Sequence, residues 1–377
     1  MSAIPYRPYY RLPTPTVPGL PPDAPDPQFK PGPRAATPNT WTFPEICAAY
    51  QWPATAPGTG VIAIGELGGG FGMAEMETYF KSIGQPMPTI TVVSVDGTKN
   101  DNNSGDADIE VALDIQGAAA SFYCTTGRAA DIRVYFAQDI APATLAAAKD
   151  GCAVMSWSWG ADESQWGKTA ADEMQAALVT ANAAGMAVFC AAGDNSSDDG
   201  GGTLGVDLPA ACPNAVACGG TTKPESGPEK VWGTPGQPNG EGTGCGYSKF
   251  FAMPVWQKDG GAPVKAGLGR MVPDLCANAD PQTGFEIFVH GKEMIIGGTS
   301  AVAPLMAGLF AALSKPGDLL GNVGEALWAD GARSCFTDIV EGGSGAYDAA
   351  VGPDPASGMG TPIGTALAAF VEGDPAA

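Results

Sequence analysis

Five short apolar segments, each separated from the next by a helix-like stretch, constrain the fold of this 377-residue chain more than any other feature. The first, Val61-Ile62-Ala63-Ile64-Gly65, contains no polar side chain, which is typical of a strand buried on both faces. Strands that alternate with helices favour a parallel sheet with helices on both faces. Strands are expected at 61–65, 89–95, 131–137, 153–158 and 187–192, and helices at 74–83, 109–120, 141–149 and 170–184.

The charge balance and the length of the apolar runs exclude two classes of partner. The chain has 19 Lys and Arg against 40 Asp and Glu, a net charge of −21, whereas a nucleic-acid-binding protein needs a basic face. No apolar run is long enough to cross a membrane, which takes about 20 residues. We therefore expect neither a nucleic-acid partner nor a membrane span. The acidic balance suits work at acid pH, but it suits an ordinary solvated surface equally well.

The cysteines and the amino-terminal residues leave the cellular compartment open. Nine cysteines are spread along the chain without a CxxC pair, so neither a zinc knuckle nor a thioredoxin-type site is predicted. Because nine is odd, at least one thiol is free or pairs between molecules. The start of the sequence lacks the basic and then apolar pattern of a secretion signal. An intracellular protein and a processed form are the two alternatives.

Proline content separates the first forty residues from the rest. Residues 1–40 hold twelve of the 34 prolines, and proline cannot donate a backbone hydrogen bond. This segment is therefore predicted to be an N-terminal extension that is extended along a surface or partly disordered. A compact domain is expected at 41–377. Within it, the Gly- and Pro-rich residues 222–262 predict a long surface excursion.

A glycine-rich turn, Gly297-Gly298-Thr299, brings Ser300 to the start of an apolar run that predicts a buried helix. Free backbone N–H groups at a helix N-terminus favour negative charge, which suits a nucleophile whose attack creates an oxyanion. The same position also suits a structural serine that caps the helix. This stretch alone does not decide between the two.

A nucleophilic serine needs a base, and the chain has a single histidine, His290, ten positions before Ser300. It lies in an expected strand–turn–strand. A Ser-His-Asp site needs a histidine held by a carboxylate, and nothing around His290 in the sequence indicates one. We interpret His290 as a structural or surface residue, and we expect a carboxylate base if Ser300 is activated.

Three carboxyl groups are candidates for the chemistry. Glu110 and Asp114 lie four residues apart, on one face of the expected 109–120 helix. Two carboxyls this close can share a proton, which gives an acid–base pair working below neutrality; a solvent-facing acidic stripe is the alternative. Asp194 follows the expected strand 187–192, at the edge where open α/β folds place their sites. A strand-end aspartate is also a common turn former.

Taken together, these segments resemble the sedolisin family of serine-carboxyl peptidases, its kumamolisin-like members in particular, from about Trp41 to Pro362. The motifs that carry the resemblance are, in chain order, Glu66-Leu67-Gly68-Gly69-Gly70, the Glu110 and Asp114 pair, Ser156-Trp157-Ser158-Trp159-Gly160, Ala192-Gly193-Asp194, Val206-Asp207-Leu208-Pro209-Ala210, Cys218-Gly219-Gly220-Thr221, Gly269-Arg270-Met271-Val272-Pro273-Asp274, Gly298-Thr299-Ser300-Ala301 and Asp354-Pro355-Ala356-Ser357-Gly358-Met359-Gly360-Thr361-Pro362. The resemblance implies a subtilisin-like α/β fold with a mostly parallel central sheet. It also implies that 41–377 is a peptidase catalytic domain.

The resemblance also assigns roles to individual residues. Ser300 would be the nucleophile, Glu110 the general base and then acid, and Asp114 the group that orients Glu110. Asp194 would line the oxyanion hole in its protonated form, because only a neutral carboxyl can donate a hydrogen bond. Glu66 and Trp159 match the family's residues that support the catalytic glutamate. Ser158 and Gly160 match the segment that pairs with the substrate backbone, and Asp207 matches a position near a specificity pocket.

A single calcium ion near the C-terminus is a further implication of the resemblance. Its ligands would be Asp338, Ile339, Ala350, Gly352 and Asp354, a set of carboxylates and backbone carbonyls that suits a hard cation. Ala350 stands where the family has glycine, which matters only if the backbone there needs a positive φ. The Asp- and Asn-rich residues 96–108 match a calcium loop poorly, and we interpret them as a turn.

The expected activity is that of an acid-acting endopeptidase that works as a monomer on peptides or proteins. The resemblance implies a secreted protein, whereas the sequence itself leaves the compartment unknown. Two departures from the family stand out. Only a short proline-rich segment precedes the domain instead of a large folded pro-domain, and residues 121–128 look longer than the usual connection after the Glu110 helix. The alternatives are a tripeptidyl exopeptidase and a catalytically silent protein that holds extended peptides.

Overall fold

A mostly parallel sheet forms the centre of the computed structural model, which describes residues 4–9, 39–103, 105–265, 267–315, 317 and 320–373. Its strands are β2 (Ile62–Glu66), β3 (Thr89–Ser94), β4 (Asp131–Phe136), β5 (Val154–Trp157), β7 (Ala187–Ala191), β9 (Val216–Thr222), β10 (Lys230–Val231) and β13 (Leu275–Asn278). They are ordered β10-β9-β7-β5-β2-β4-β3, with β13 also paired to β9. Only the pairing of β10 with β9 is antiparallel among these strands. The five strands predicted from the sequence are all present.

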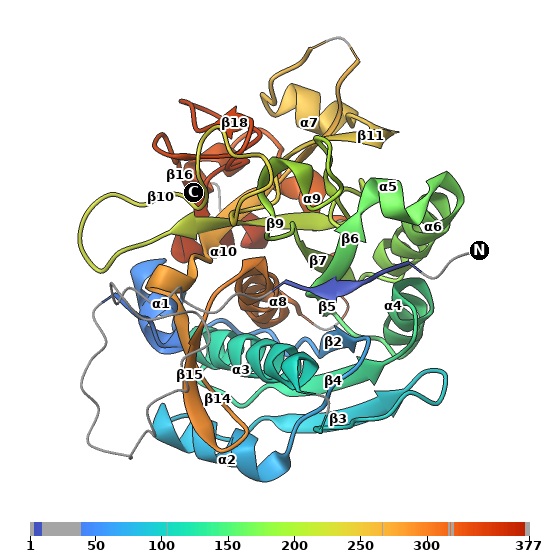
Figure 1. Cartoon of the computed structure of the whole chain (residues 1–377). Helices are drawn as coiled ribbons and strands as arrows, with labels where there is room; N and C mark the ends of the chain where they lie inside the picture. The colour runs from blue at the N-terminus through green and yellow to red at the C-terminus, as the bar shows by residue number, and fades with distance from the viewer. Residues whose placement is uncertain are drawn as a thin grey trace, which may run out of the picture.

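Helices cover both faces of this sheet (Figure 1). On one face lie α4 (Ile140–Lys149) and α6 (Lys168–Ala183); on the other lie α1 (Phe43–Ala49), α2 (Met73–Ser82), α3 (Asp106–Thr126), α8 (Val302–Leu313) and α10 (Gly364–Glu372). Successive strand residues point to opposite faces, so Ile62 and Ile64 of β2 join the core with α3 and α8, while Ala63 joins the core with α4 and α6. The predicted fold class is confirmed.

Helices α3 and α8 pack directly against each other on the sheet, and a glycine sets their separation. A Cβ atom at Gly308 of α8 would lie 2.4 Å from the carbonyl oxygen of Ala118 in α3, so any side chain there would push the helices apart. The Ser121 hydroxyl donates to the carbonyl of Leu305 at 2.6 Å and accepts from the Trp52 indole at 2.8 Å. Packing and hydrogen bonding thus fix the relative position of the two helices.

Smaller elements surround the sheet. Three antiparallel pairs are β11 (Gly246–Ala252) with β12 (Gly269–Val272), β14 (Phe285–Val289) with β15 (Lys292–Ile296), and β17 (Gly343–Ser344) with β18 (Tyr347–Asp348). A fourth pair is β16 (Phe336–Thr337) with β19 (Thr361–Pro362), and β6 (Trp159–Asp162) lies between β1 (Arg7–Pro8) and β8 (Asp207–Leu208). The remaining helices are α5 (Glu163–Trp166), α7 (Val255–Asp259), α9 (Val323–Leu327) and the 3-10 turns η1 (Ser196–Asp198), η2 (Pro281–Thr283), η3 (Thr299–Ala301) and η4 (Ala332–Cys335).

Two expectations about loops are wrong. Residues 121–128 are not a long connection, because α3 continues to Thr126 and ends at Gly127, whose left-handed φ of 68° closes the helix. Residues 222–262 are not simply a surface excursion, since they contain β10, β11 and α7 and bury Trp232 and Cys245. The sequence misled because glycine and proline mark the turns between these short elements, not the burial of the elements themselves.

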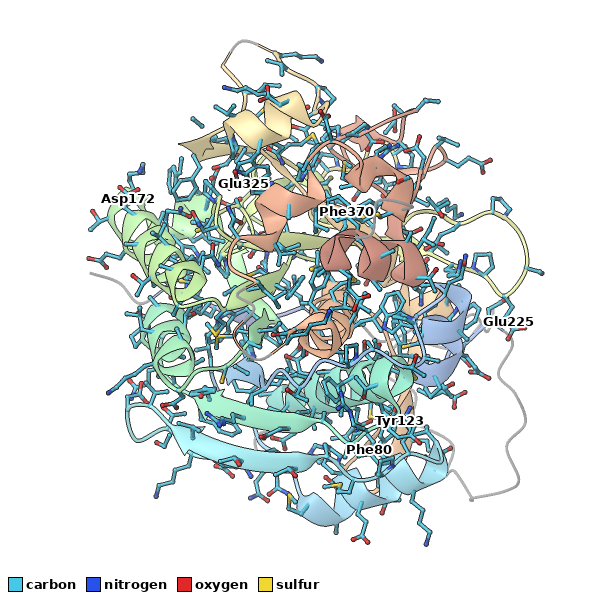
Figure 2. All side chains as sticks on the ribbon, turned by 180° about the vertical axis from the view of Figure 1, so that it is seen from behind. Phe80, Tyr123, Asp172, Glu225, Glu325 and Phe370 are labelled. Carbon is cyan, nitrogen blue, oxygen red and sulfur yellow. The ribbon has the colours of Figure 1, made fainter. Side chains whose placement is uncertain are left out.

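The acidic side chains divide into an exposed and a buried population. The exposed carboxylates of Asp172 and Glu225 lie at opposite edges of the molecule in Figure 2, and Glu325 is exposed as well. The buried carboxyls are the acidic groups whose placement needs a further explanation.

All nine cysteines are free thiols. Among the described helices, none is long and apolar enough to span a membrane.

Candidate active site

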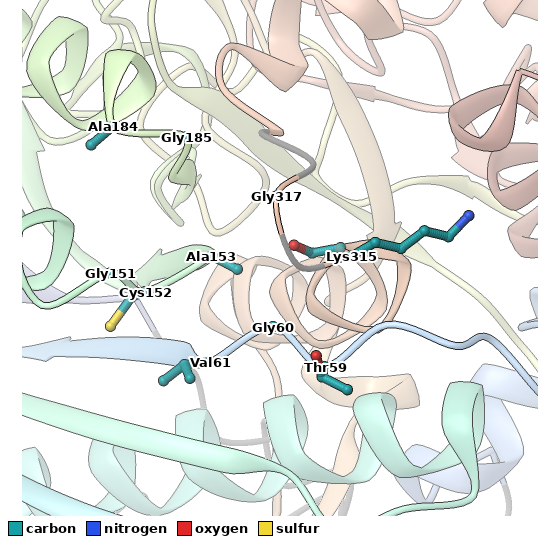
Figure 3. A pocket seen from close by; sticks show the side chains of 11 residues that line it. Thr59, Gly60, Val61, Gly151, Cys152, Ala153, Ala184, Gly185, Lys315 and Gly317 are labelled. Atoms are coloured by element: carbon teal, nitrogen blue, oxygen red, sulfur yellow. The ribbon is translucent and has the colours of Figure 1, made fainter.

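The predicted site residues gather at the carboxyl ends of the central strands. Glu66 is the last residue of β2, Ser158 follows β5, and Asp194 lies three residues after β7. A cavity of about 230 Å³ lies instead near the start of the same strands, lined by residues such as Val61, Ala153 and Lys315 (Figure 3). Open α/β sheets place their chemistry at the carboxyl edge, so the cavity is not part of this site.

Ser300 lies in the 3-10 turn η3, directly before α8. Gly298 at the start of this turn has a φ of 116°, a conformation that favours glycine at this position. The Ser300 hydroxyl is fully buried and donates to the carbonyl oxygen of Ser158 at 3.4 Å. The predicted position of Ser300 at a helix N-terminus is thereby observed.

Glu110 and Asp114 point into the protein, and both are fully buried. The solvent-facing acidic stripe is therefore excluded. Burial raises the pKa of Glu110 well above its ordinary value, the charges of Asp114 and Glu66 raise it further, and the Ser300 hydroxyl opposes the shift. Burial likewise raises the pKa of Asp114, whereas Glu110 and the Ser158 hydroxyl, which donates to Asp114 at 2.8 Å, lower it. The Ser300 hydroxyl and the carboxyl of Asp114 each act on the pKa of Glu110 and are buried with it.

Glu66 and Trp159 extend this acid cluster away from Ser300. The indole Nε1 of Trp159 donates to Glu66 Oε2 at 2.8 Å. Burial raises the pKa of Glu66, the charge of Asp114 raises it further, and the indole hydrogen bond partly offsets both effects. Glu66 therefore favours its neutral form beside Asp114, as two close buried carboxyls must if they are not to hold two negative charges.

Asp194 lies against the turn that carries Ser300. Its Oδ1 accepts hydrogen bonds from both the backbone N–H and the hydroxyl of Thr299, each at 2.8 Å. Thr299 also ties Gly193 to this turn, through a 3.2 Å hydrogen bond from the Gly193 N–H to its hydroxyl. Sequence reasoning did not single out Thr299, although it lies in the Gly-Thr-Ser motif.

The described part of the N-terminal extension lies against the same site. Strand β1 pairs antiparallel with β6, Arg7 opposite Gly160, and the Tyr9 N–H donates to the carbonyl of Ser158 at 3.0 Å (Figure 1). The carbonyl of Tyr9 accepts from the backbone N–H of Ser300 at 2.9 Å. The Tyr9 hydroxyl donates to Asp207. Ser158, Gly160 and Asp207, predicted to bind substrate, therefore all contact or pair with this segment.

His290 is a surface residue, as interpreted from the sequence, but it is held by a carboxylate that the sequence around it did not indicate. Its Nε2 lies 2.8 Å from Oδ2 of Asp108, at the turn between β14 and β15. The two residues are 182 positions apart, so local sequence could not show the pairing. The His290 side chain is 42% exposed, whereas Ser300 is fully buried among carboxyls. The pair is a surface contact between α3 and the hairpin, and Glu110 is the titratable group beside Ser300.

The predicted calcium ligands gather in one loop region. The Gly352 N–H donates to Asp338 at 2.8 Å, and the Ala350 N–H donates to Asp354 at 2.9 Å. Within the described chain, the carbonyl oxygens of Ile339, Ala350 and Gly352 accept no hydrogen bond from protein groups. Arg333 lies 2.6 Å from the other oxygen of Asp338 and is a competing cation. Two carboxylates and three available carbonyls fit a hard cation.

Comparison with known proteins assigns the chain to a family. Residues 87–319, more than half of the chain, match the family model described as "Subtilase family". The chain belongs to the subtilase family. This subtilase is 37% identical to kumamolisin from Bacillus sp. (strain MN-32), over 90% of its own length and 65% of that protein. It is 28% identical to a probable tripeptidyl-peptidase from Trichophyton verrucosum, over 73% of its own length and 54% of that protein.

The solved structures give the same assignment at the level of fold. This subtilase is similar to Pseudomonas sedolisin, a serine-carboxyl proteinase, with a TM-score of 0.77 and 23% identity over 90% of this chain and 100% of that one. Its similarity to sphericase is weaker, with a TM-score of 0.53 and 20% identity over 87% and 99% of the two chains. Together with the kumamolisin match, this confirms the predicted kumamolisin-like sedolisin relationship. The chain spans 54% to 65% of the two curated relatives it matches above.

Proposed function

We propose that this subtilase is an acid-acting serine-carboxyl endopeptidase that hydrolyses peptide bonds through an acyl-enzyme on Ser300. One observation carries the proposal: Ser300, Glu110 and Asp114 are all fully buried, and burial raises the pKa of both carboxyls while the Ser300 hydroxyl lowers that of Glu110. A carboxylate can act as a general base, and a pair that shares one proton can also act as a general acid.

In the proposed reaction, Glu110 takes the proton of Ser300 as Oγ attacks the substrate carbonyl, and later returns it to the leaving amine. Asp114 would accept a hydrogen bond from protonated Glu110 and so set the orientation of its carboxyl. The developing oxyanion accepts one hydrogen bond from the Ser300 N–H and another from the carboxyl of Asp194, which can donate only when it is protonated. Glu66, which accepts a hydrogen bond from the Trp159 indole, raises the pKa of Glu110 through its charge.

The proposal is tested by peptide cleavage from acid to neutral pH with the full chain and two variants. Ser300→Ala should lower kcat by about a millionfold. Glu110→Gln, which keeps the shape but removes the base, should lower it by about 100- to 10,000-fold. The wild-type optimum is expected on the acid side. Tight peptide binding without cleavage at any acid pH would instead identify a silent binding protein.

The length of chain held in the cleft favours an endopeptidase over a tripeptidyl exopeptidase. Tyr9 carries the carbonyl that contacts Ser300, so β1 covers the second and third residues before it, and Tyr6 is the fourth. The Tyr6 ring contacts Trp166, and its hydroxyl donates to Asp139 at 3.0 Å, so the bound chain continues beyond the third residue. A tripeptidyl peptidase needs a cleft that is closed at that distance. Long peptides with a blocked N-terminus should therefore be cut, and resistance of blocked peptides with cleavage of free ones would favour the exopeptidase.

We further propose that Asp338, Asp354 and the carbonyls of Ile339, Ala350 and Gly352 hold one calcium ion. The oxygen-only donor set and the three available carbonyls support it. The ion would supply positive charge that holds the 338–354 loops together. Two hydrogen bonds already join these loops, one from the Gly352 N–H to Asp338 and one from the Ala350 N–H to Asp354.

A further inference from the structure

We propose that Cys47 and Cys124 form a thiol–disulfide exchange site, at which a low-molecular-weight disulfide such as oxidised glutathione joins α1 to α3 through a Cys47–Cys124 disulfide. The inference is independent of the proposed function, because neither cysteine takes part in the proposed hydrolysis. All nine cysteines are free thiols, and Cys124 alone among them is not buried. It is therefore the thiol that a reagent in solution can reach.

Helix α1 and the residues after it lie along one face of α3 (Figure 1). Gly117, Ser121 and Cys124 share this face, because residues four and seven positions apart lie above one another in a helix. A Cβ atom at Gly117 would lie 3.0 Å from Cζ of Phe43 in α1. The indole of Trp52 donates to Ser121 Oγ at 2.8 Å. The chain from α1 onwards thus follows α3 in the direction of Cys124.

Cys47 lies between these two contacts. It is one helical turn after Phe43 in α1, and its carbonyl accepts a hydrogen bond from the Trp52 N–H at 2.9 Å. The Cys47 side chain is buried, so it faces α3 in the stretch from Ser121 to Cys124. Each of the two thiols changes the pKa of the other, as neighbouring groups do. Two cysteines on adjacent helices are therefore close together without being bonded.

The two thiols differ in the way that an attacking and a resolving thiol differ. Interaction with Cys47 lowers the pKa of Cys124, burial opposes this shift, and the amide of Gln85, which donates to Cys124 Sγ at 3.5 Å, lowers the pKa further. Burial raises the pKa of Cys47 well above its ordinary value, and Cys124 raises it more. Because the thiolate is the nucleophile in exchange, Cys124 attacks first and Cys47 resolves.

A hydrogen-bond donor without an acceptor lies near the pair. Tyr79 of α2 is buried, and its hydroxyl has no hydrogen-bond partner among the residues that the structure describes. Burial raises the pKa of Tyr79, and the charges of Cys47, Glu286 and Cys124 raise it further, so both thiols are within electrostatic range of the hydroxyl. A buried hydroxyl gains from an acceptor, and a thiolate formed during exchange would supply one.

The exchange balances in two steps. The Cys124 thiol gives up its proton, and its sulfur attacks one sulfur of oxidised glutathione; the S–S bond breaks, and the departing sulfur takes the proton as the first reduced glutathione. Cys47 then attacks the Cys124 sulfur of the mixed disulfide, and its own proton leaves with the second reduced glutathione. The two cysteines are oxidised by two electrons in total, and oxidised glutathione is reduced by the same two.

The disulfide would join the first helix of the domain to the helix that carries Glu110 and Asp114. It would close a loop that contains β2, α2 and β3, together with most of α3. A disulfide that closes a long loop restricts the unfolded chain and so stabilises the folded one. The oxidised protein is therefore expected to resist unfolding better than the reduced protein.

The test incubates the reduced full chain with oxidised glutathione at neutral pH, blocks the remaining thiols with iodoacetamide and digests the unfolded protein with trypsin without reduction. The tryptic peptides 35–81 and 100–128 contain one cysteine each, Cys47 and Cys124. They should be recovered joined, with the loss of two hydrogen atoms in mass. The melting temperature of the oxidised chain should be higher by about 5 °C, and dithiothreitol should reverse the increase.

Two variants assign the order of attack. Cys47→Ala should hold glutathione on Cys124 as a stable mixed disulfide, because no second thiol resolves it, and its melting temperature should not rise. Cys124→Ala should take up no glutathione at Cys47, which is buried. Cys335→Ala, which removes another buried thiol, is the control and should form the same joined peptides as wild type.

Alkylation of the native wild type keeps the test valid if Cys47→Ala does not fold. Iodoacetamide should label Cys124 at least about tenfold faster than any other cysteine. Faster labelling of a buried cysteine would overturn the assignment of Cys124 as the attacking thiol. Peptides 35–81 and 100–128 that stay separate after oxidation, or a disulfide from either cysteine to a third one, would overturn the inference. Joined peptides without a rise in melting temperature would overturn the stabilising role.

Discussion

The carboxyl oxygen Oδ1 of Asp194 accepts two hydrogen bonds from Thr299, one from its backbone N–H and one from its hydroxyl, each at 2.8 Å. Thr299 immediately precedes Ser300, so the same turn that presents the proposed nucleophile also orients the carboxyl proposed to face its oxyanion. Two donors on Oδ1 favour Oδ2 as the oxygen that carries a proton when Asp194 is neutral.

Asp194→Asn is therefore expected to remain active, and to remain active at a higher pH than wild type. An asparagine can accept from Thr299 with its oxygen and donate with its amide, without needing a proton from solution. Asp194→Ala should lower kcat by about 100- to 1,000-fold, because the donor is lost. The measurement is kcat against pH for wild type and both variants. Equal losses in the asparagine and alanine variants would contradict a donor role.

Stability should fall as pH rises above the ordinary carboxyl range. Burial raises the pKa values of Glu66, Glu110 and Asp114 above their ordinary values of 4.5, 4.5 and 3.8. Above those values the folded chain keeps protons that the unfolded chain has released, so the free energy of unfolding decreases with pH until the folded groups also ionise. At pH values below the ordinary pKa values, these groups are protonated in both the folded and the unfolded chain, so this loss of stability is absent. Each unit of raised pKa corresponds to about 1.4 kcal/mol.

Urea unfolding across this pH range measures the effect. In a variant with Glu66→Gln, Glu110→Gln and Asp114→Asn, the midpoint should fall less steeply with pH than in wild type. The exposed Asp172→Asn serves as the control and should leave the slope unchanged. A wild-type midpoint that rises from acid to neutral pH would show that these carboxyls are charged in the folded protein.

Gly308→Ala should impair catalysis although it lies two turns along α8 from Ser300. Its Cβ would meet the Ala118 carbonyl at 2.4 Å, and overpacking of this kind costs about 1–3 kcal/mol. The helices would separate, and with them Ser300 and Glu110, so kcat should fall more than KM rises. Gly240→Ala, whose Cβ would make only ordinary contacts at 3.5 Å, is the matched control. Unchanged kcat in a destabilised Gly308→Ala protein would show that the helix spacing does not govern the reaction.

A strong calcium chelator should lower the melting temperature if the proposed ion is bound. An ion at about 100 times its Kd stabilises the folded state by about 2.7 kcal/mol. Asp338→Asn and Asp354→Asn should each remove most of the chelator effect, whereas the exposed neighbour Asp348→Asn should keep it. A melting temperature that the chelator leaves unchanged in wild type would argue against the ion.

The sequence predicted the fold because its signals are local. Apolar strands and the helices between them follow from residue order, and the carboxyl edge then follows from parallel pairing. The spacing of Glu110 and Asp114 placed both on one helix face, although only the packing of α3 on α8 shows that this face is buried. The end of α3 was missed because Ser121 and Thr125, which disfavour helices in isolation, bond to neighbouring backbone groups here.

Contacts between distant segments could not be predicted in the same way. Asp199 lies 192 positions from Arg7, and Asp108 lies 182 positions from His290. Neither pairing leaves a pattern in a single sequence. The proline-rich start indicated an extended segment, and residues 4–9 are extended, but nothing in their composition indicated the cleft in which they lie.

Glu66 ends β2, the strand with a parallel neighbour on each side, whereas Ser300 lies at the tip of a helix that is held mainly by side-chain contacts. Of the acid cluster, only Glu66 is thus anchored in the sheet, whereas Glu110 and Asp114 lie on α3, the helix that packs directly against α8. On gradual warming, turnover would then cease through a small shift of one helix while the hydrogen-bonded ladder is still whole.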